Sequence, residues 1–351
     1  MLIFANYFGC IMQRKQFFEA FDAVIQTPKR FVVVSHVNPD GDAIGSSLAF
    51  AQFLKKLGHQ AEVVVSNDFP EFLAWMPGAC NVHIYDKAPE ACDELLKSAE
   101  VLAILDFNHV SRSGLVQNTI KELNINKILI DHHRDTDFDQ FLCALSDTNV
   151  SSTSELVAEL ILHYGERFLD ESIATNLLVG IITDTGSFAH SVYHPEIFSI
   201  CAKLVDKSVS YNQIHRLIYD TFSEDRLRLL GYSISNKMEV LDEYATAIIS
   251  LSKEELAKFN YQVGDTEGVV NFPLSMKKIK MSVLVTERQG VIRFSFRSKG
   301  SFSVHELANK YFNGGGHTNA AGGTLTCSLE AALEKLHQVL PEYKDLLNQM
   351  D

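Results

Sequence analysis

Short apolar runs alternate with longer amphipathic segments through the first half of the chain. The run 31–35 is rich in β-branched residues, as is typical of a buried parallel strand, and it ends at His36. A tight turn then leads into a helical pattern over 43–57. Strands alternating with helices indicate an α/β fold with a doubly wound, mainly parallel sheet. Further strands are expected over 61–65, 101–105 and 127–130, and further helices over 15–25, 152–164 and 171–183.

The pattern changes in the second half of the chain. Residues from about 195 to 237 stay helical and amphipathic, which indicates a helical connection. Strand-like runs follow, and the last two form a predicted hairpin at Gln289-Gly290. We therefore predict a smaller α+β domain across a cleft from the first, with domain ranges 12–195, a helical linker 196–238, and 239–351. The expected elements of this domain are strands over 243–251, 280–288 and 290–298, a glycine-rich segment over 313–323 and a helix over 329–340.

The composition indicates an ordinary soluble globular protein and argues against binding of long nucleic acid. The chain has 351 residues, of which 46% are hydrophobic and 21% charged, enough for two domains with cores. Its formal charge of −13 excludes a broad basic surface for long nucleic acid. A short anionic substrate in a local pocket is compatible with this charge.

The six cysteines show no CxxC spacing, which favours a reducing compartment and argues against a disulfide framework or a structural zinc site. We expect a cytoplasmic protein, since no apolar run reaches the length of a membrane span. The opening MLIFANYFGCIM lacks a basic first region and a small-residue cleavage site, so it is not predicted to be a signal peptide. Translation from Met1 and from Met12 are both compatible with the sequence.

Polar residues gather where the predicted strands end. They are His36 with Asp40 and Asp42, then Asp106, then Asp131-His132-His133, and Asp184 follows a predicted helix. Each group alone also fits a cap, a turn or a solvated loop. Together, at the carboxyl ends of strands, they predict a metal site. Carboxylates mixed with imidazoles suit Mn²⁺, with Mg²⁺, Co²⁺ and Fe²⁺ as alternatives, and a pair of such ions about 4 Å apart assists displacement at phosphorus.

The second domain carries a candidate phosphate site. In VIRFSFRS, Arg293 and Arg297 alternate with apolar residues and so share one face of a strand, where a guanidinium suits a phosphate. An exposed polar face is the alternative, above all for Arg293. Glycines 314–316 would let backbone N–H groups approach an anion, and His317 is expected to open a short helix. A plain turn is the alternative, and the family resemblance described next favours ligand binding by Gly315, Gly316 and His317.

The motifs His36-x-Asn38-Pro39-Asp40-Gly41-Asp42, Asp106, Asp131-His132-His133 and Asp184 resemble those of the DHH phosphoesterase superfamily. The tail FRS (296–298) and GGGHTNAAGG (314–323) resembles its associated C-terminal domain, so the resemblance covers nearly the whole chain. It implies an oligoribonuclease that also dephosphorylates 3′-phosphoadenosine 5′-phosphate (pAp). It also implies that His36, Asp40 and Asp106 hold one Mn²⁺, that Asp42, Asp106, His132 and Asp184 hold a second, and that His133 faces the scissile phosphate.

Rival functions share parts of this pattern. A phosphodiesterase of cyclic or linear dinucleotides would use the same core, and a homodimer is also left open. A manganese pyrophosphatase shares the first-domain motifs but not the GGGH tail, and a long-strand exonuclease would need more basic surface. A non-catalytic nucleotide sensor would not need a complete ligand set. Among the remaining residues, Arg112 is expected to support the Asp106 loop. Ser152 to Glu155 form a predicted capping box, with contact to the site as the alternative.

Overall fold

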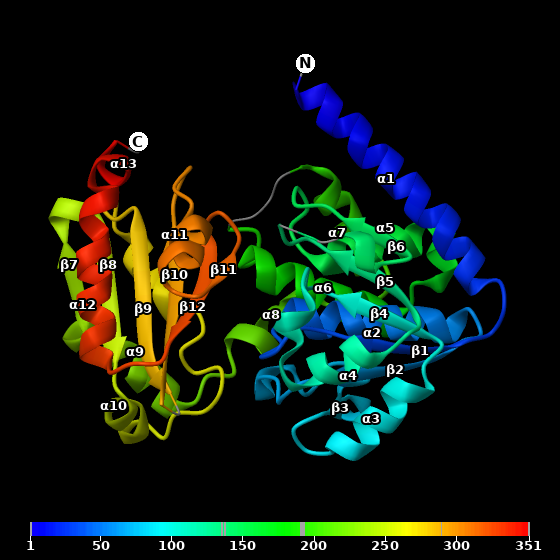
Figure 1. Cartoon of the computed structure of the whole chain (residues 1–351), viewed down its shortest axis with the longest axis horizontal. Coiled ribbons are helices and arrows are strands. Elements are labelled where there is room, and N and C mark those ends of the chain that lie inside the picture. The colour runs from blue at the N-terminus through cyan, green and yellow to red at the C-terminus, as the bar shows by residue number, and fades with distance from the viewer. Residues whose placement is uncertain (1, 135, 137, 190–193, 289, 350–351) are drawn as a thin grey trace. The chain divides into compact units, whose positions relative to one another are not determined.

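The computed structural model describes residues 2–134, 136, 138–189, 194–288 and 290–349, with side chains from Arg14 onwards. The chain forms two compact units, Met1–Thr221 and Phe222–Asp351, each of which is described by itself (Figure 1). The division falls inside the predicted helical linker. Among the described residues, no helix combines the length and the apolar character that crossing a bilayer requires.

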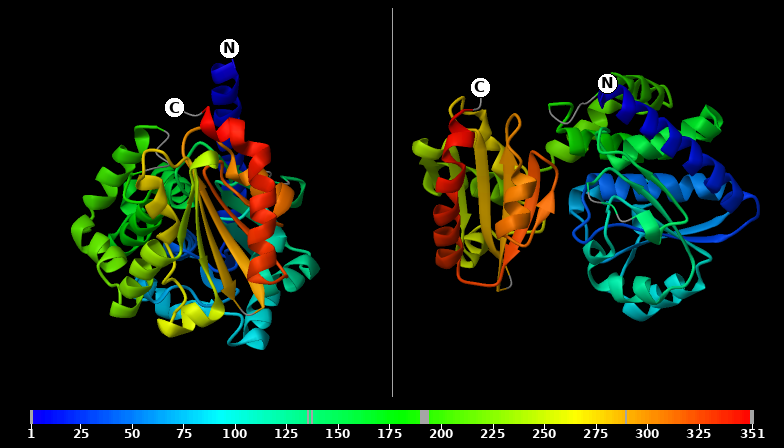
Figure 2. Two further views of the ribbon diagram at one scale, coloured as in Figure 1. Left: turned by 90° about the vertical axis from the view of Figure 1, so that its left-hand side faces the viewer. Right: turned by 45° about the horizontal axis from the view of Figure 1, so that its top comes forward.

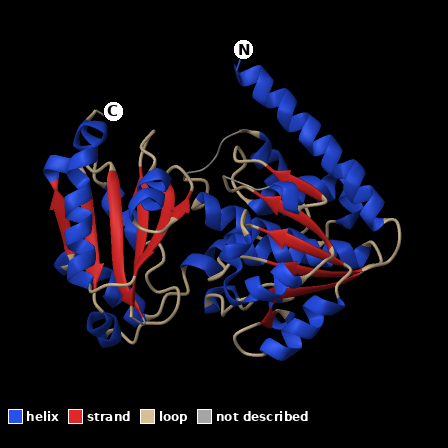
Figure 3. Ribbon diagram, viewed as in Figure 1, coloured by secondary structure: helices blue, strands red, loops and turns tan. Residues whose placement is uncertain are grey.

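The first unit contains a six-stranded sheet in the order β3-β2-β1-β4-β5-β6, and every pairing in it is parallel (Figure 3). This confirms the predicted doubly wound sheet. The order reverses between β1 and β4, and such a switch point is where open α/β sheets bind ligands. The edge strands β3 and β6 were not predicted because they are short. The strands are β1 Arg30–Val34, β2 Gln60–Val65, β3 His83–Ile84, β4 Val101–Leu105, β5 Asn126–Asp131 and β6 Cys143–Ser146.

Helices cover both faces of this sheet (Figure 2). Alternate residues of β1 separate two cores: Val33 packs with α1, α2, α5 and α6, whereas Val32 and Val34 pack with α3 and α4. Helix α1 begins at Leu2 and not at the predicted Lys15, because no proline interrupts the apolar opening. The helices are α1 Leu2–Ile25, α2 Gly41–Lys56, α3 Pro89–Ser98, α4 Gln117–Glu122, α5 Thr153–Tyr164, α6 Glu171–Thr185, α7 Glu196–Val205 and α8 Tyr211–Tyr219.

The second unit contains a mixed six-stranded sheet in the order β11-β12-β10-β9-β8-β7, in which β8 and β9 are parallel. Strands β9 and β10 form the predicted hairpin, although Gln289 at its turn lies outside the described residues. One face of the sheet packs Phe294 and Phe296 against Phe312 and helices α11 and α12. The elements are β7 Met238–Leu241, β8 Thr246–Leu251, β9 Met281–Arg288, β10 Val291–Ser298, β11 Gly315–Gly316, β12 Ala320–Leu325, α9 Glu224–Asn236, α10 Lys253–Lys258, α11 Val304–Tyr311, α12 Leu329–Val339 and α13 Lys344–Asn348.

The prediction that His317 opens a helix is wrong. Gly315–Gly316 form the short strand β11, which pairs antiparallel with β12. The N–H of His317 donates to the carbonyl of Ala320 over 2.6 Å, which closes a tight turn. Gly316 adopts φ 150°, which a side chain disfavours, and an added Cβ there would lie 2.4 Å from the Ala320 carbonyl oxygen. These glycines therefore allow a close strand pairing in place of a helix start.

Candidate metal centre

The loop after β1 supplies the first group of ligands. The buried strand ends before His36, and Asp40 caps helix α2 because its Oδ1 accepts hydrogen bonds from the N–H groups of Asp42 and Ala43 over 3.0 and 3.1 Å. Its other oxygen, Oδ2, lies 4.0 Å from Nε2 of His36. The carboxylate of Asp40 therefore caps a helix with one oxygen and faces the His36 imidazole with the other. A capping role and a role as a metal ligand are thus compatible for this residue.

Asp106 lies at the centre of the cluster, directly after β4. The residue is 2% exposed, and its backbone adopts φ 65°, an unusual value for a residue other than glycine. Its Oδ2 lies 3.3 Å from Nε2 of His36, while its Oδ1 lies 3.4 Å from Nε2 of His132. One carboxylate thus faces two histidines from two different strand ends.

The second group contains Asp42, His132 and Asp184. Nε2 of His132 lies 3.3 Å from Oδ2 of Asp184 and 3.9 Å from Oδ2 of Asp42. Asp42 lies in the first turn of α2, and His132 follows β5. Asp184 was expected after a helix ending at residue 183, but it lies in the last turn of α6, which ends at Thr185. The helix backbone therefore fixes the position of this carboxylate.

The N-terminus of α5 contacts both groups. The N–H groups of Thr153 and Ser154 donate to the two oxygens of Asp42 over 2.7 and 2.8 Å, and the hydroxyl of Thr153 donates to Oδ1 of Asp106 over 3.0 Å. The partial positive charge of a helix start stabilises such carboxylates. Gly180 of α6 leaves room for this contact, since an added Cβ would lie 2.7 Å from Oδ1 of Asp42.

The predicted capping box at this helix is present in part. The hydroxyl oxygen of Ser152 accepts from the N–H of Glu155 over 3.1 Å, as predicted. The Glu155 carboxylate, however, accepts from the N–H and the hydroxyl of Ser151 over 2.8 and 2.6 Å. The capping motif located the helix start, and the alternative that this segment touches the site holds as well, through the hydroxyl of Thr153.

His133 is held by Asp131. Nδ1 of His133 donates to Oδ1 of Asp131 over 2.7 Å, and Asp131 is fully buried. Because an ionised carboxylate only accepts, this bond fixes the imidazole tautomer with its proton on Nδ1. Burial lowers the pKa of His133, which favours the neutral ring. The sequence motif contains Asp131, but it gave this residue no role.

The pKa values of the buried carboxylates and histidines around Asp106 are strongly perturbed by their burial and by one another. Burial raises the pKa of Asp42 to about 8, and burial together with the neighbouring Asp42 raises that of Asp184 well above its usual range. Burial opposes ionisation of Asp106, yet hydrogen bonds from His132 and His36 hold its pKa well below the usual value. Burial lowers the pKa of His132, but its hydrogen bond with Asp106 and the charges of Asp184, Asp106 and Asp42 together raise it to about 10.

The residues present fit two hard divalent cations. The ligand atoms of His36, Asp40 and Asp106 lie within 4.8 Å of one another, as do those of Asp42, His132 and Asp184. Asp131 also has a buried Oδ2 for which the described residues supply no hydrogen bond. Buried carboxylates at this density are stable only with compensating positive charge. Oxygen and imidazole ligands are those that Mn²⁺ and similar ions accept.

The predicted phosphate-site residues lie together in the second unit. Strand pairing places Arg297 opposite Ala320, beside the turn that contains His317. The guanidinium donates from Nη1 to the carbonyl of Phe296 over 3.0 Å, which restrains its orientation. The N–H groups of Gly314 and Gly316 donate inside the unit, to the carbonyl of Ala308 and to Nδ1 of His305. Substrate contact by Gly315 and Gly316 stays a prediction.

Comparison with known proteins agrees with the division of the chain into two units. Residues 30–181 match the family model described as DHH family, N-terminal domain, and residues 242–342 match the DHHA1 domain. The first match covers the first sheet and the cluster residues from His36 to His133, and it ends before Asp184. The second covers strands β8 to β12 of the sheet with Arg297. They agree with the resemblance that the sequence motifs indicated.

Individual relatives cover most of the chain. The bifunctional oligoribonuclease and PAP phosphatase NrnA of Thermus thermophilus is 30% identical over 312 residues, which is 88% of this chain and 89% of that protein. The cyclic-di-AMP phosphodiesterase GdpP of Bacillus subtilis is 27% identical over 344 residues, 92% of this chain but 49% of that protein. The crystal structure of an exopolyphosphatase-related protein from Bacteroides fragilis is 40% identical, with a TM-score of 0.90 over 95% of this chain and 98% of that chain.

Proposed function

Since the chain belongs to the DHH family and carries a DHHA1 domain, we propose that it is a phosphoesterase dependent on two divalent cations, preferably Mn²⁺. Its proposed substrates are very short RNA oligomers, cut to mononucleotides, and pAp, dephosphorylated to AMP. The relative from Thermus thermophilus, named for both activities, supports this assignment. We place the reaction in the cytoplasm, where these substrates arise.

The observation that carries the proposal is the position of Asp106 between two histidines, with one carboxylate oxygen toward each. His36, Asp40 and Asp106 are the proposed ligands of one cation, and Asp42, Asp106, His132 and Asp184 those of the other. When bound, such a pair of cations activates a water molecule and offsets the negative charge of the reacting phosphate. Mg²⁺ and Co²⁺ suit this mixed set of oxygen and imidazole ligands less well than Mn²⁺ and are proposed substitutes.

His133 is proposed to face the reacting phosphate. Its Nδ1 bonds to Asp131, and contact with the phosphate is therefore proposed for Nε2. Asp131 orients the imidazole, and the start of α5 holds Asp42 and Asp106 in place. The first unit therefore supplies both the ligand set and the side chain that contacts the phosphate.

The second unit is proposed to bind a non-reacting part of the substrate. Arg297 offers a guanidinium for a terminal phosphate, and His317 lies in the adjoining turn. The glycines around His317 permit the close pairing of β11 with β12. Binding energy from such contacts helps to position the reacting phosphate.

A side-by-side assay tests the assignment. The purified protein with Mn²⁺ should hydrolyse dinucleotides and pAp far faster than thirty-nucleotide RNA, because its charge of −13 opposes binding of long polyanions. Cyclic dinucleotides belong in the same assay, since the GdpP relative supports them as an alternative. Faster hydrolysis of cyclic dinucleotides than of pAp would favour that alternative, and equal rates on short and long RNA would indicate a processive nuclease.

A further inference from the structure

Aromatic side chains form a continuous row that starts four residues after Asp184. The ring of Phe188 lies 5.4 Å from that of Phe198 and 6.4 Å from that of Tyr211, measured between centroids. His215 lies 6.0 Å from Tyr211 and 4.7 Å from Tyr219. We call these five residues the aromatic row. It joins the end of α6, which carries a proposed metal ligand, to helices α7 and α8.

The first ring of the row is presented by an unusual backbone. Gly186, Ser187 and Phe188 all adopt left-handed conformations, with φ of 53°, 58° and 67°. Left-handed backbone is disfavoured for a bulky residue such as phenylalanine. The turn is maintained because Ser187 N–H donates to the Ile182 carbonyl over 2.9 Å and Phe188 N–H donates to the Thr185 hydroxyl over 2.9 Å. Strain that surrounding contacts enforce next to a reactive site is evidence of a functional constraint.

The row is not a simple extension of the core. Three of its members, Phe188, Tyr211 and Tyr219, pack against the core of the first unit but are only partly buried. Phe198, in the first turn of α7, is 51% exposed. Tyr211, His215 and Tyr219 are spaced four residues apart, so they share one face of α8. The hydroxyl of Tyr219 bonds to the carbonyl of Ile182, which anchors this face to α6.

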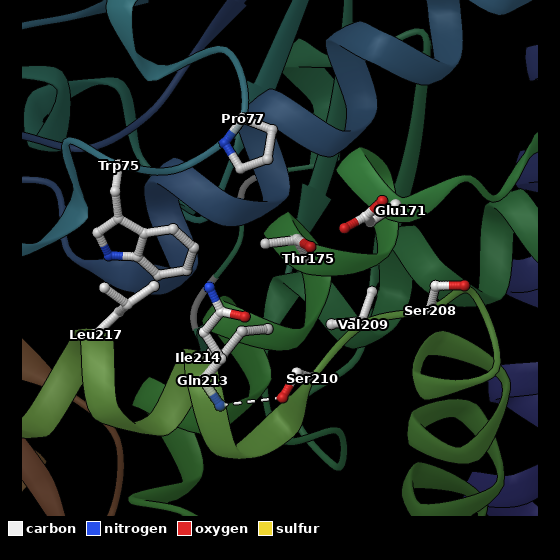
Figure 4. Close-up of a pocket in the computed structure, with 10 residues that line it drawn as sticks. All are labelled: Trp75, Pro77, Glu171, Thr175, Ser208, Val209, Ser210, Gln213, Ile214 and Leu217. Carbon is white, nitrogen blue, oxygen red and sulfur yellow. Dashed lines mark hydrogen bonds between the residues drawn. The ribbon is translucent and has the colours of Figure 1, made fainter.

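The neighbouring face of α8 is a poorer candidate. Ile214 and Leu217 line a cavity with Trp75 and Thr175 (Figure 4). Its volume of about 180 Å³ is below the ~300 Å³ at which ligand pockets usually begin. It is therefore too small for a nucleotide, and the exposed aromatic row is the surface that suits one.

We propose that the aromatic row, through Phe188 and Phe198, is a stacking site for a nucleobase of the substrate whose phosphate lies at the metal centre. The inference rests on the proposed function and adds a base-binding site to it. Every nucleobase presents a π face, so stacking on aromatic rings tolerates any sequence. Stacking also needs no positive charge, which suits a protein that carries a formal charge of −13 and still acts on short polyanions.

The test compares an intact dinucleotide with an abasic analogue that keeps the sugars and the phosphate. The chosen variant is Phe198→Ala, because the ring is exposed and its removal spares the core. Phe138→Ala is the matched control, since Phe138 is 48% exposed in the same unit and outside the aromatic row. The measured quantities are kcat/KM on both substrates and bound metal. Stacking predicts that Phe198→Ala lowers kcat/KM on the intact dinucleotide by about fivefold or more and leaves the abasic analogue unchanged.

Three outcomes decide the matter. A selective loss on the intact substrate supports the base site. An equal loss on both substrates, or a loss no larger than in Phe138→Ala, overturns it. If the unmodified protein cleaves neither dinucleotide, the proposed function fails, and the base site is judged from binding of AMP against ribose 5-phosphate by calorimetry. In that case Phe198→Ala must weaken binding of AMP and leave ribose 5-phosphate unchanged, and any other result overturns the inference.

Discussion

The backbone N–H of Gly316 donates a hydrogen bond to Nδ1 of His305 over 3.1 Å. The acceptor nitrogen must be unprotonated, so this bond also fixes the imidazole tautomer of His305. The ring lies against Gly315 as well, where an added Cβ would come within 3.6 Å of Cε1. Helix α11 thus positions the glycine turn that carries His317.

Replacing His305 should disturb substrate binding without touching the metals. His305→Phe keeps a ring but removes the acceptor of the half-buried Gly316 N–H, and leaving such a donor unpaired costs about 1 kcal/mol or more. We expect KM for pAp to rise by about fivefold or more, with bound manganese unchanged. His305→Asn is the control, because its side-chain oxygen can accept from the Gly316 N–H in place of Nδ1. If both variants behave like the unmodified protein, His305 has no positioning role.

Asp106 should be the least replaceable carboxylate of the metal centre. Asp106→Asn removes a charge that faces both His36 and His132, so both ligand groups are weakened at once. Activity on dinucleotides should fall by at least ~10³-fold, and metal analysis should find fewer than two ions per chain. Asp93→Asn is the control, since Asp93 accepts from Tyr85 and Thr119 and belongs to neither proposed ligand group. Near-normal turnover of Asp106→Asn with two ions bound would contradict the site.

The hydroxyl of Thr153 should contribute to metal binding or turnover independently of the backbone N–H of the same residue. Thr153→Ser keeps the donor to Oδ1 of Asp106, whereas Thr153→Val removes it and keeps the shape. Loss of one hydrogen bond to a charged group costs about 1.5–3 kcal/mol. We expect Thr153→Val to weaken Mn²⁺ binding or kcat by ~10-fold or more, with Thr153→Ser close to the unmodified protein. Calorimetric titration with Mn²⁺ measures the first effect, and equal behaviour of the two variants would show that the backbone contacts to Asp42 suffice.

The clustering of the proposed ligands could be predicted because local sequence carries it. His36 and Asp40 lie within one turn, and Asp106 and His132 follow their strands directly, so strand ends and turn chemistry located them. The contact of Thr153 with Asp42 joins residues 111 positions apart. Neither segment alone indicates that these two residues are partners.

The second unit shows the same limit. Glycines before His317 suggest a turn or a helix start, and only the pairing of β11 with β12 decides between them. In the sequence, His305 has no ligand-like neighbours along the chain. Its partner, Gly316, is brought to it by the packing of α11 on the sheet. Tertiary contacts of this kind leave no periodic signal in the sequence.

Because Asp131 orients the imidazole of His133, replacing Asp131 should misorient that ring. Asp131→Asn is nearly the same shape, but an amide can donate to Nδ1 and so favour the wrong imidazole tautomer. Loss of such a supporting partner typically costs about 10- to 100-fold in activity. We expect a fall in kcat on pAp of this size with both metals retained. Asp147→Asn is a suitable control, as Asp147 is also largely buried but pairs with Arg14. A loss of metal instead would make Asp131 part of the ligand set.

The two arginines of β10 separate substrate binding from the chemical step. Arg293 and Arg297 lie on the same face of the strand, opposite Thr286 and Ser282 of β9. Arg297 alone is placed beside the His317 turn, since its other neighbour is Ala320, whereas Arg293 lies opposite Thr324. Under the proposed function, Arg297 binds a phosphate that does not react, and Arg293 is its matched control on the same strand.

Arg297→Ala should therefore retain both metals and yet hydrolyse pAp and dinucleotides poorly. Charge-assisted contacts to phosphate contribute about 1.5–3 kcal/mol, so kcat/KM should fall by ~10-fold or more. Arg293→Ala should show a much smaller fall. Bis-p-nitrophenyl phosphate carries no second phosphate, so its hydrolysis should be little affected by either change, which separates a binding defect from a damaged metal centre. If Arg297→Ala lost metal, or lost activity on all three substrates equally, the second unit would support the fold of the enzyme and would not select its substrate.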